Sequence, residues 1–247
     1  MLKKKLLVVA LASAFSLPAM AGDHTVTANV GFVTDYVYRG ITQTSHKPAL
    51  QGGVDYSHAS GFYAGLWGSN VSWIKDSATL STGDKTLELD TYLGFKGAAS
   101  EVSYDIGAVR YNYLGSGKPL SPYVSADTAE LYGAATYKWF TAKYSYSLLD
   151  GFLTFPGTKG TSYFDISGSY TLEDSGVILG AHYGKQDIKN ISGVSYADYK
   201  LSASKDFSGY VVGAAVTGTD AGPLWTYPSN GGNWGKTVVA LSVLRAF

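Results

Sequence analysis

The sequence lacks cysteine altogether, which excludes a disulfide framework and a thiolate-bound metal site. After the first residues it also lacks any apolar run near the roughly eighteen residues that a membrane-spanning helix needs, so a helical membrane protein is excluded. It has only four histidines and contains no HExxH, GxSxG or phosphate-cradling loop. We therefore predict no metal site, no cofactor and no enzymatic activity.

Residues 1–21 have the pattern of a secretory signal peptide. Three lysines at the start precede an apolar stretch from Leu6 to Leu17, and Ala19-Met20-Ala21 has the form of a cleavage site. The apolar stretch is too short to favour a membrane anchor. We predict that residues 22–247 form one exported domain, which carries 16 basic and 19 acidic residues. This balance offers no basic surface to nucleic acid, which we exclude as a partner.

Polar and apolar residues alternate along the mature chain, most clearly from Leu87 to Lys96, where one face is apolar and the other charged. Neighbouring side chains of a strand point to opposite faces, so this pattern predicts strands between two unlike environments. Most of the segments have the length of about nine to eleven residues that crosses a membrane as a tilted strand. The twelve segments lie near residues 25–36, 49–58, 62–71, 86–96, 102–113, 127–137, 140–149, 162–171, 177–184, 196–205, 210–219 and 236–247.

The connections between these segments alternate in length. Short ones such as 59–61 and 138–139 alternate with long ones such as 37–48 and 220–235, which are rich in Gly, Ser, Thr, Pro and Asp. Five short turns and six long loops are typical of a barrel with one end in the periplasm and the other outside. We predict an all-β fold, a transmembrane antiparallel up-and-down β-barrel of about 12 strands in the bacterial outer membrane, with both termini periplasmic.

A soluble lipocalin-like barrel is the alternative, because it shows the same alternation with its apolar face turned inward. Twelve strands, however, enclose more volume than these small residues fill. Aromatic residues also gather beside the short turns, as in the interfacial girdle of a membrane barrel. They are Phe62, Phe95, Phe140, Tyr170, Phe207, Tyr210 and Phe247.

The terminal Phe247 resembles the signal that the outer-membrane barrel-assembly machinery reads, although Arg245 departs from the usual apolar residue. We expect this machinery, outer-membrane lipids with lipopolysaccharide, and small hydrophilic solutes as partners. Arg110 falls on the outward register of its strand, which predicts either a bulge or a position near the rim.

A charge that faces lipid at mid-membrane costs about 2–4 kcal/mol for Lys or Arg, so most ionisable strand residues are expected to face the lumen. If their opposite charges pair, the interior is a packed plug; if they segregate, the lumen is a wet filter that tunes permeation. The predicted pore-lining residues are Asp35, Arg39, Glu88, Asp90, Lys96, Asp105, Glu130, Lys143, Asp165, His182, Asp198 and Lys200. Asp55 shares this inward register.

Asp35 and Arg39 lie where the first strand passes into the first long loop. One interpretation is that they pair with each other and fasten the loop to the wall. The other is that the loop folds inward and Arg39 lines a constriction.

The segment from Asn29 to Gly40, together with residues 41–44, 48–52 and 61–71, resembles the TorF family of bacterial outer-membrane barrels. Weaker similarity runs through the rest of the mature chain. The resemblance implies an outer-membrane location and a pore, and it supplies no catalytic or ligand-binding residues.

The sequence therefore predicts a porin-like channel for the passive diffusion of small hydrophilic solutes. One alternative is a non-conducting barrel with a binding or structural role through its surface loops. A weaker alternative is a lipid-acting enzyme in which a histidine such as His58 or His182 pairs with a serine.

Overall fold

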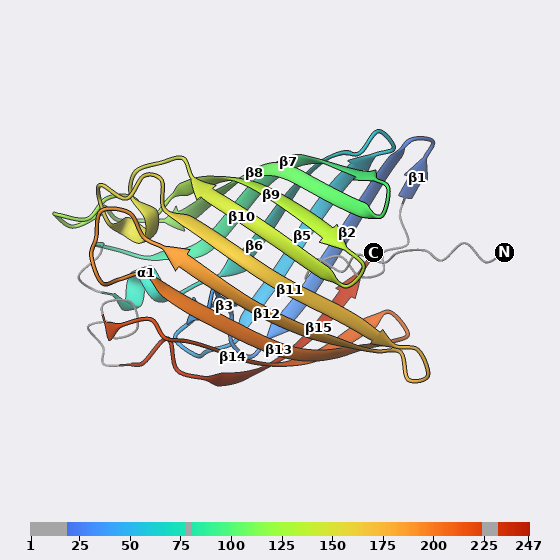
Figure 1. Ribbon diagram of the computed structural model, residues 1–247. Coiled ribbons are helices and arrows are strands. Elements are labelled where there is room, and N and C mark those ends of the chain that lie inside the picture. The colour runs from blue at the N-terminus through green and yellow to red at the C-terminus, as the bar shows by residue number, and fades with distance from the viewer. Residues whose placement is uncertain (1–18, 78–80, 224–231) are drawn as a thin grey trace.

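The structure, a computed structural model, describes residues 19–77, 81–223 and 232–247 (Figure 1). Residues 1–18, most of the predicted signal peptide, lie outside the described residues, and its cleavage stays a prediction. The adjoining β1 (Ala19–Ala21) pairs with the first strand of the barrel.

Twelve antiparallel strands form a closed barrel, as predicted. Each strand pairs with the next along the chain, and the last pairs with the first across a seam. The strands are β2 (His24–Val33), β5 (Ala49–His58), β6 (Phe62–Asn70), β7 (Lys85–Ala99), β8 (Val102–Gly115), β9 (Thr128–Tyr137), β10 (Phe140–Ser147), β11 (Ser162–Leu172), β12 (Val177–Asp187), β13 (Tyr196–Phe207), β14 (Tyr210–Thr219) and β15 (Val238–Ala246).

The seam between β2 and β15 is a short ladder. It holds five register pairs, from Asn29 with Ala246 to Val33 with Ser242. On its other side, β2 pairs with β5 over ten register pairs. Since an antiparallel barrel of even strand number returns to its starting end, β2 begins and β15 ends at the end with the short turns.

The alternation of the sequence places apolar side chains outside and polar side chains inside. Leu50, Ile106 and Val239 on the outer face are 62–64% exposed, whereas Glu88 and Asp198 inside are 2% exposed. The lipocalin-like interpretation is therefore wrong, because its apolar face would point inward. The predicted girdle residues beside the short turns are all exposed as well.

Arg110 keeps its outward register without a bulge. The pairing of β7 with β8 is regular from Leu87 onward, and the Arg110 side chain is exposed and donates a hydrogen bond to Asn112 (2.8 Å). The bulge alternative for this residue is therefore wrong.

Three of the long connections contain structure of their own. The first holds a short hairpin of β3 (Val37–Tyr38) and β4 (Ile41–Thr42), the second holds helix α1 (Trp73–Asp76), and a later one holds the 3-10 helix η1 (Phe152–Thr154). Among the described residues, no helix combines the length and apolarity that crossing a membrane requires.

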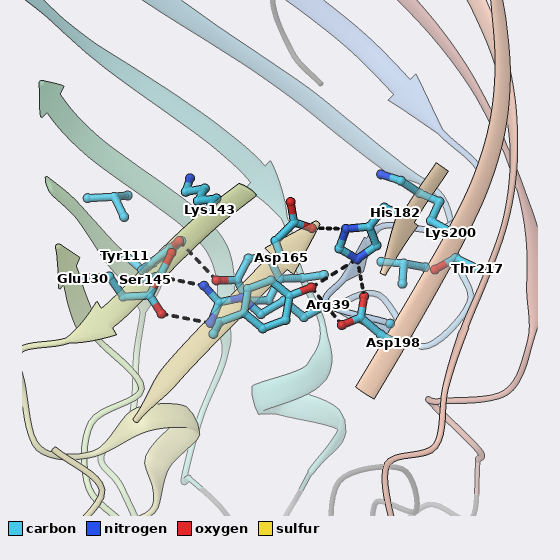
Figure 2. A pocket seen from close by; sticks show the side chains of 15 residues that line it. Arg39, Tyr111, Glu130, Lys143, Ser145, Asp165, His182, Asp198, Lys200 and Thr217 are labelled. Carbon is cyan, nitrogen blue, oxygen red and sulfur yellow. Dashed lines mark hydrogen bonds and ion pairs between the residues drawn. The ribbon is translucent and has the colours of Figure 1, made fainter. Parts of the chain in front are cut away.

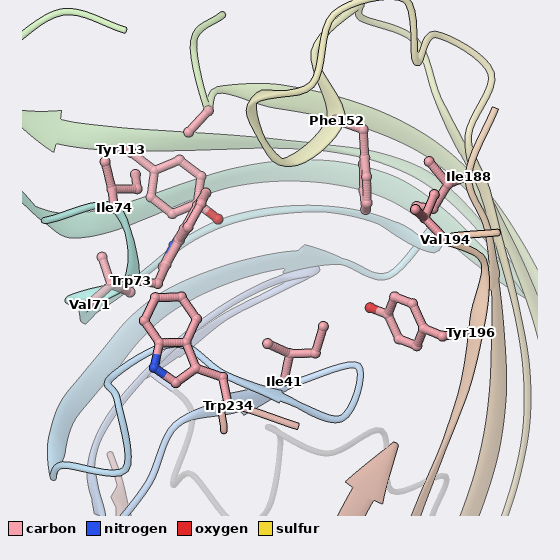
Figure 3. Close-up of a cluster of buried hydrophobic side chains, with 11 residues drawn as sticks. Ile41, Val71, Trp73, Ile74, Tyr113, Phe152, Ile188, Val194, Tyr196 and Trp234 are labelled. Carbon is pink, nitrogen blue, oxygen red and sulfur yellow. The ribbon is translucent and has the colours of Figure 1, made fainter. Parts of the chain in front are cut away.

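The loops at the other end pack inward into an apolar cluster, which we call the loop-end cluster (Figure 3). Ile74 and Phe152 from α1 and η1 are 1% and 2% exposed within it. The cluster lies inside the wall at the loop end. Its members are Ile41, Val71, Trp73, Ile74, Tyr113, Ala126, Phe152, Ile188, Val194, Tyr196 and Trp234.

Candidate functional site

The first long loop turns into the barrel instead of away from it. We call Val37–Thr42, which contains β3 and β4, the inward hairpin. Its tip adopts positive φ at Arg39 (46°) and Gly40 (78°). A Cβ on Gly40 would lie 2.6 Å from the Cβ of Asp198 and 2.8 Å from that of Thr219, so only glycine lets the tip sit this close to β13 and β14.

Arg39 fastens this tip to the far wall (Figure 2). Its guanidinium donates to both oxygens of Glu130 (2.7 and 3.0 Å) and to the side-chain oxygen of Gln186 (2.8 Å). It also lies over the rings of Tyr163 (4.2 Å) and Tyr38 (4.8 Å). The side chains of Arg39 and Glu130 are 7% and 3% exposed. A bidentate pair buried to this degree holds the inward hairpin in one position across the lumen.

The charge of Arg39 is maintained by its partner. Burial alone would lower the pKa of the guanidinium, but the carboxylate of Glu130 more than offsets this, and the pKa stays well above its ordinary value. Of the two interpretations of this loop, the inward fold is the one in the structure.

Asp35 does not pair with Arg39, so the predicted fastening between these two residues is wrong. It accepts hydrogen bonds from Thr42 (2.5 Å) and His46 (2.7 Å) instead. The other ring nitrogen of His46 lies 2.8 Å from the carbonyl oxygen of Asn233. Asp35 therefore organises the base of the inward hairpin, and Arg39 anchors its tip.

One side of the lumen carries a row of alternating charges on β10 to β13, which we call the charged wall: Lys143, Asp165, His182, Asp198 and Lys200. His182 contacts Asp165 through Nδ1 and Asp198 through Nε2 (2.7 Å). Together with Arg39 and Glu130, the charged wall lines a cavity of about 350 Å³ (Figure 2). Opposite charges thus compensate one another along this wall.

The opposite side carries two neighbouring acidic groups. Glu88 and Asp90 project inward from β7, and we call this pair the acidic wall. The Tyr36 hydroxyl donates to Oε1 of Glu88 (3.2 Å), while Oε2 of Glu88 and Oδ1 of Asp90 have no hydrogen-bond partner among the residues that the structure describes. In the part of the chain that the structure describes, neither carboxylate forms an ion pair.

Near the short turns the lumen charges meet tyrosines. Tyr63 donates to Asp105 and Tyr92 donates to Asp55, both at 2.6 Å. The exposed Lys96 lies over the Tyr63 ring (4.6 Å). This end is polar and lacks the apolar packing of the loop end.

The structure thus joins some predicted residues and separates others. Arg39 meets Glu130, and His182 meets Asp165 and Asp198. Asp35, Lys96 and Asp105 take no part in these pairs, and neither does the acidic wall. That these residues line a path for solutes stays a prediction. Residues missed by the sequence analysis are Tyr36, Tyr38, Tyr63, Tyr111, Tyr163 and Gln186. Those on strands share the inward register, which was the available signal.

The histidines offer little to hydrolytic chemistry. Both nitrogens of His182 face carboxylates, so neither is free to take a serine proton. His58 does contact the Ser60 hydroxyl (2.8 Å), but this is a local contact within a tight turn, and His58 also accepts the Ser60 N–H. Within the described ranges, no three His, Asp or Glu side chains are placed to hold a metal ion.

The model of the family described as "Bacterial protein of unknown function (Gcw_chp)" matches residues 18–247 of this chain. No curated protein matches it. A solved structure titled "Unveiling the Mechanism Behind the in-meso Crystallization of Membrane Proteins" is similar with a TM-score of 0.52 and 7% identity, covering 90% of this chain and 83% of that one.

Two outer-membrane structures have lower scores. The COG4313 outer membrane channel from Pseudomonas putida F1 has a TM-score of 0.48 and 10% identity, covering 95% of this chain and 99% of that one. OccK5 (OpdH) from Pseudomonas aeruginosa has a TM-score of 0.42 and 12% identity, covering 92% of this chain and 67% of that one. Likeness at such identities concerns the fold alone, and the resemblance to the TorF family stays a prediction. By the extent of the family-model match, the chain belongs to the Gcw_chp family.

Proposed function

We propose that this member of the Gcw_chp family is an outer-membrane channel of the porin type, which passes small polar solutes through a lumen narrowed by the inward hairpin. The observation that carries the proposal is the cavity of about 350 Å³ between Arg39 and the charged wall. A barrel that served only as a scaffold could fill this space with apolar side chains. Here it is lined with charges and hydroxyls, which suit hydrated solutes.

The outer face supports a membrane location. Apolar side chains such as Leu50, Ile106 and Val239 are more than half exposed on strands all around the barrel. A water-soluble monomer rarely exposes apolar area of this extent, whereas lipid tails cover it without cost. Exposed aromatics beside the short turns match the headgroup level of a bilayer.

The proposed orientation follows from the connections. Short turns face the periplasm and long loops face outward in such barrels, so both ends of the mature chain would be periplasmic. Phospholipid, lipopolysaccharide and the assembly machinery that reads the end at Phe247 are the partners that this location implies.

Planar-bilayer recording tests the proposal. Purified barrel is first shown to be folded by its heat-dependent mobility on gels, and it is then inserted into the bilayer in potassium chloride. We expect discrete single-channel steps of small conductance. Folded protein that inserts and never produces a step would contradict the channel.

One observation favours a second candidate, a non-conducting barrel that acts through its loops. The long loops pack into the loop-end cluster, in which Trp73, Phe152 and Trp234 are each at most 6% exposed. The same recordings separate the two, because a non-conducting barrel stays silent even when Arg39 is replaced by alanine. The less favoured lipid-acting enzyme is tested by lipid release with His58→Ala and His182→Ala, where unchanged release would remove both histidines from consideration.

A further inference from the structure

We propose that the acidic wall, Glu88 with Asp90, is a binding site for a monovalent cation, either an alkali ion or the ammonium head of a small amine. This inference deepens the proposed function, on which its transport readout depends, by naming the class of solute that the channel favours.

The first step is the missing compensation. Glu88 is 2% exposed and Asp90 is 8% exposed, and each carries a buried carboxylate oxygen to which no described residue donates a hydrogen bond. A buried carboxylate is strongly destabilising unless a positive charge or hydrogen bonds offset it. Elsewhere in the lumen, Glu130 has Arg39 and Asp198 has His182, so this chain supplies such partners to other buried acids. Among the described residues the acidic wall has no such partner, and we assign that place to a cation from outside the chain.

The second step is geometry. Glu88 and Asp90 are two residues apart on β7, so both project into the lumen about 7 Å apart along the strand. Their partners in register on the next strand, β8, are Tyr113 and Tyr111, and on β6 they are Ser69 and Trp67. Both carboxylates therefore project from the same face of β7 toward the lumen.

The third step is the aromatic surround. Tyr36 packs edge-on against Trp67 (5.5 Å between ring centroids) and donates to Glu88. Tyr38 donates to Tyr111 (3.1 Å), and both of these tyrosines also line the cavity of the charged wall. Aromatic faces attract cations and add to carboxylates in the recognition of ammonium groups. A monovalent cation, with its weak hydration, fits such a site better than a divalent ion that needs more charged oxygen ligands.

Thermal unfolding in detergent gives a test that does not depend on conduction. We compare the melting temperature in potassium chloride, in ethylammonium chloride and in N-methylglucamine chloride, whose cation is much bulkier than the other two, at equal ionic strength. Potassium, ethylammonium or both are expected to raise the melting temperature by about 3 °C at ten times the dissociation constant. The rise is expected to vanish in the double variant Glu88→Gln/Asp90→Asn.

The matched control is Asp55→Asn, which removes one lumen charge whose carboxylate already accepts from Tyr92. This variant should keep the cation-dependent rise. The single variants Glu88→Gln and Asp90→Asn replace the double variant if that fails to fold. A rise with potassium alone assigns an alkali ion, and a rise with ethylammonium alone assigns an amine. The cation site is overturned if neither cation raises the melting temperature, or if the double variant shows an equal rise. A proton shared between the two carboxylates would then compensate the buried charge.

Reversal potentials across a potassium chloride gradient test the consequence for transport. We expect the wild-type channel to prefer potassium over chloride several-fold and the double variant to lose most of that preference. A silent wild-type barrel would contradict the proposed channel, while the melting experiment would still decide the cation site. A channel with equal preference in wild type and double variant would show that the site plays no part in selection.

Discussion

The two sides of the lumen differ in how the charges of their buried carboxylates are compensated. On the charged wall, each buried acid has a basic partner, as Asp198 has His182. On the acidic wall, Glu88 and Asp90 have none among the described residues. Arg39, on the inward hairpin between the two sides, is committed to Glu130 and Gln186. Compensation inside this barrel is therefore local, and the same substitution of acid by amide should have opposite effects on the two walls.

Removing the anchor between the walls should have the largest effect. Arg39→Ala leaves Glu130 buried without its partner, and we expect a loss of about 3–5 kcal/mol in the free energy of unfolding. The inward hairpin is also released from β9 and β12, so single-channel conductance should rise several-fold. Urea titration and bilayer recording measure the two effects. Arg110→Ala, which removes an exposed arginine from the outer face, is the control, and an equal response of both variants would contradict the anchor.

A substitution on the charged wall comes next. Asp198→Asn takes the carboxylate from the His182 imidazole and the Tyr163 hydroxyl, which donates to it at 2.8 Å. Because His182 keeps Asp165, we expect a loss of about 2 kcal/mol. Asp187→Asn is the control, since its ion pair with Lys189 is more than half exposed. A neutral Asp198→Asn would show that the charges of this wall are not coupled.

The tip of the inward hairpin offers a steric test. Gly40→Ala places a Cβ against Asp198 and Thr219 at a positive φ, and we expect a loss of about 1–2 kcal/mol together with a changed conductance. Gly193 has a similar φ of 75°, and nothing lies within 4 Å of a Cβ built there. Gly193→Ala therefore measures the backbone strain alone. If both variants lose the same stability, the tip is not closely packed.

The acidic wall should give the smallest effect, with the opposite sign. In N-methylglucamine chloride, Glu88→Gln removes an uncompensated buried charge, and we expect a gain of about 1 kcal/mol in the free energy of unfolding. Glu101→Gln, in an exposed turn, should change stability by less than about 0.5 kcal/mol. A loss of stability in Glu88→Gln would show that the carboxylate of Glu88 is compensated, as the acids of the charged wall are.

The barrel itself was predictable because its signals are local. Alternation marks each strand, and the predicted 49–58 and 210–219 coincide with β5 and β14. The strands β7 and β8 run longer than predicted, because they pair with each other from Lys85 with Gly115 to Ala99 with Val102, beyond the alternating segments. The number of strands, twelve, follows from the alternation of short and long connections.

The site was less predictable because its partners are distant in the sequence. Arg39 was recognised as a candidate, but Glu130 and Gln186 lie 91 and 147 residues away. The pairing of Asp35 with Arg39 was one expectation, based on their nearness along the chain. In the structure Asp35 forms its hydrogen bond with His46 instead. An inward register identifies which residues face the lumen, whereas the tilt of the strands and the path of the inward hairpin decide which of them meet.

The seam between β2 and β15 also has a consequence for assembly. Its five register pairs join the two ends of the barrel, so the chain segment that must be closed before they form spans all the other strands. Hairpins between consecutive strands close short loops and can form early, whereas this ladder bears the largest loss of chain entropy. The seam should therefore form last during insertion and open first under denaturant. Among the barrel strands, amide exchange should be fastest at those amides of Asn29–Val33 and Ser242–Ala246 that bond across the seam and not to β5 or β14.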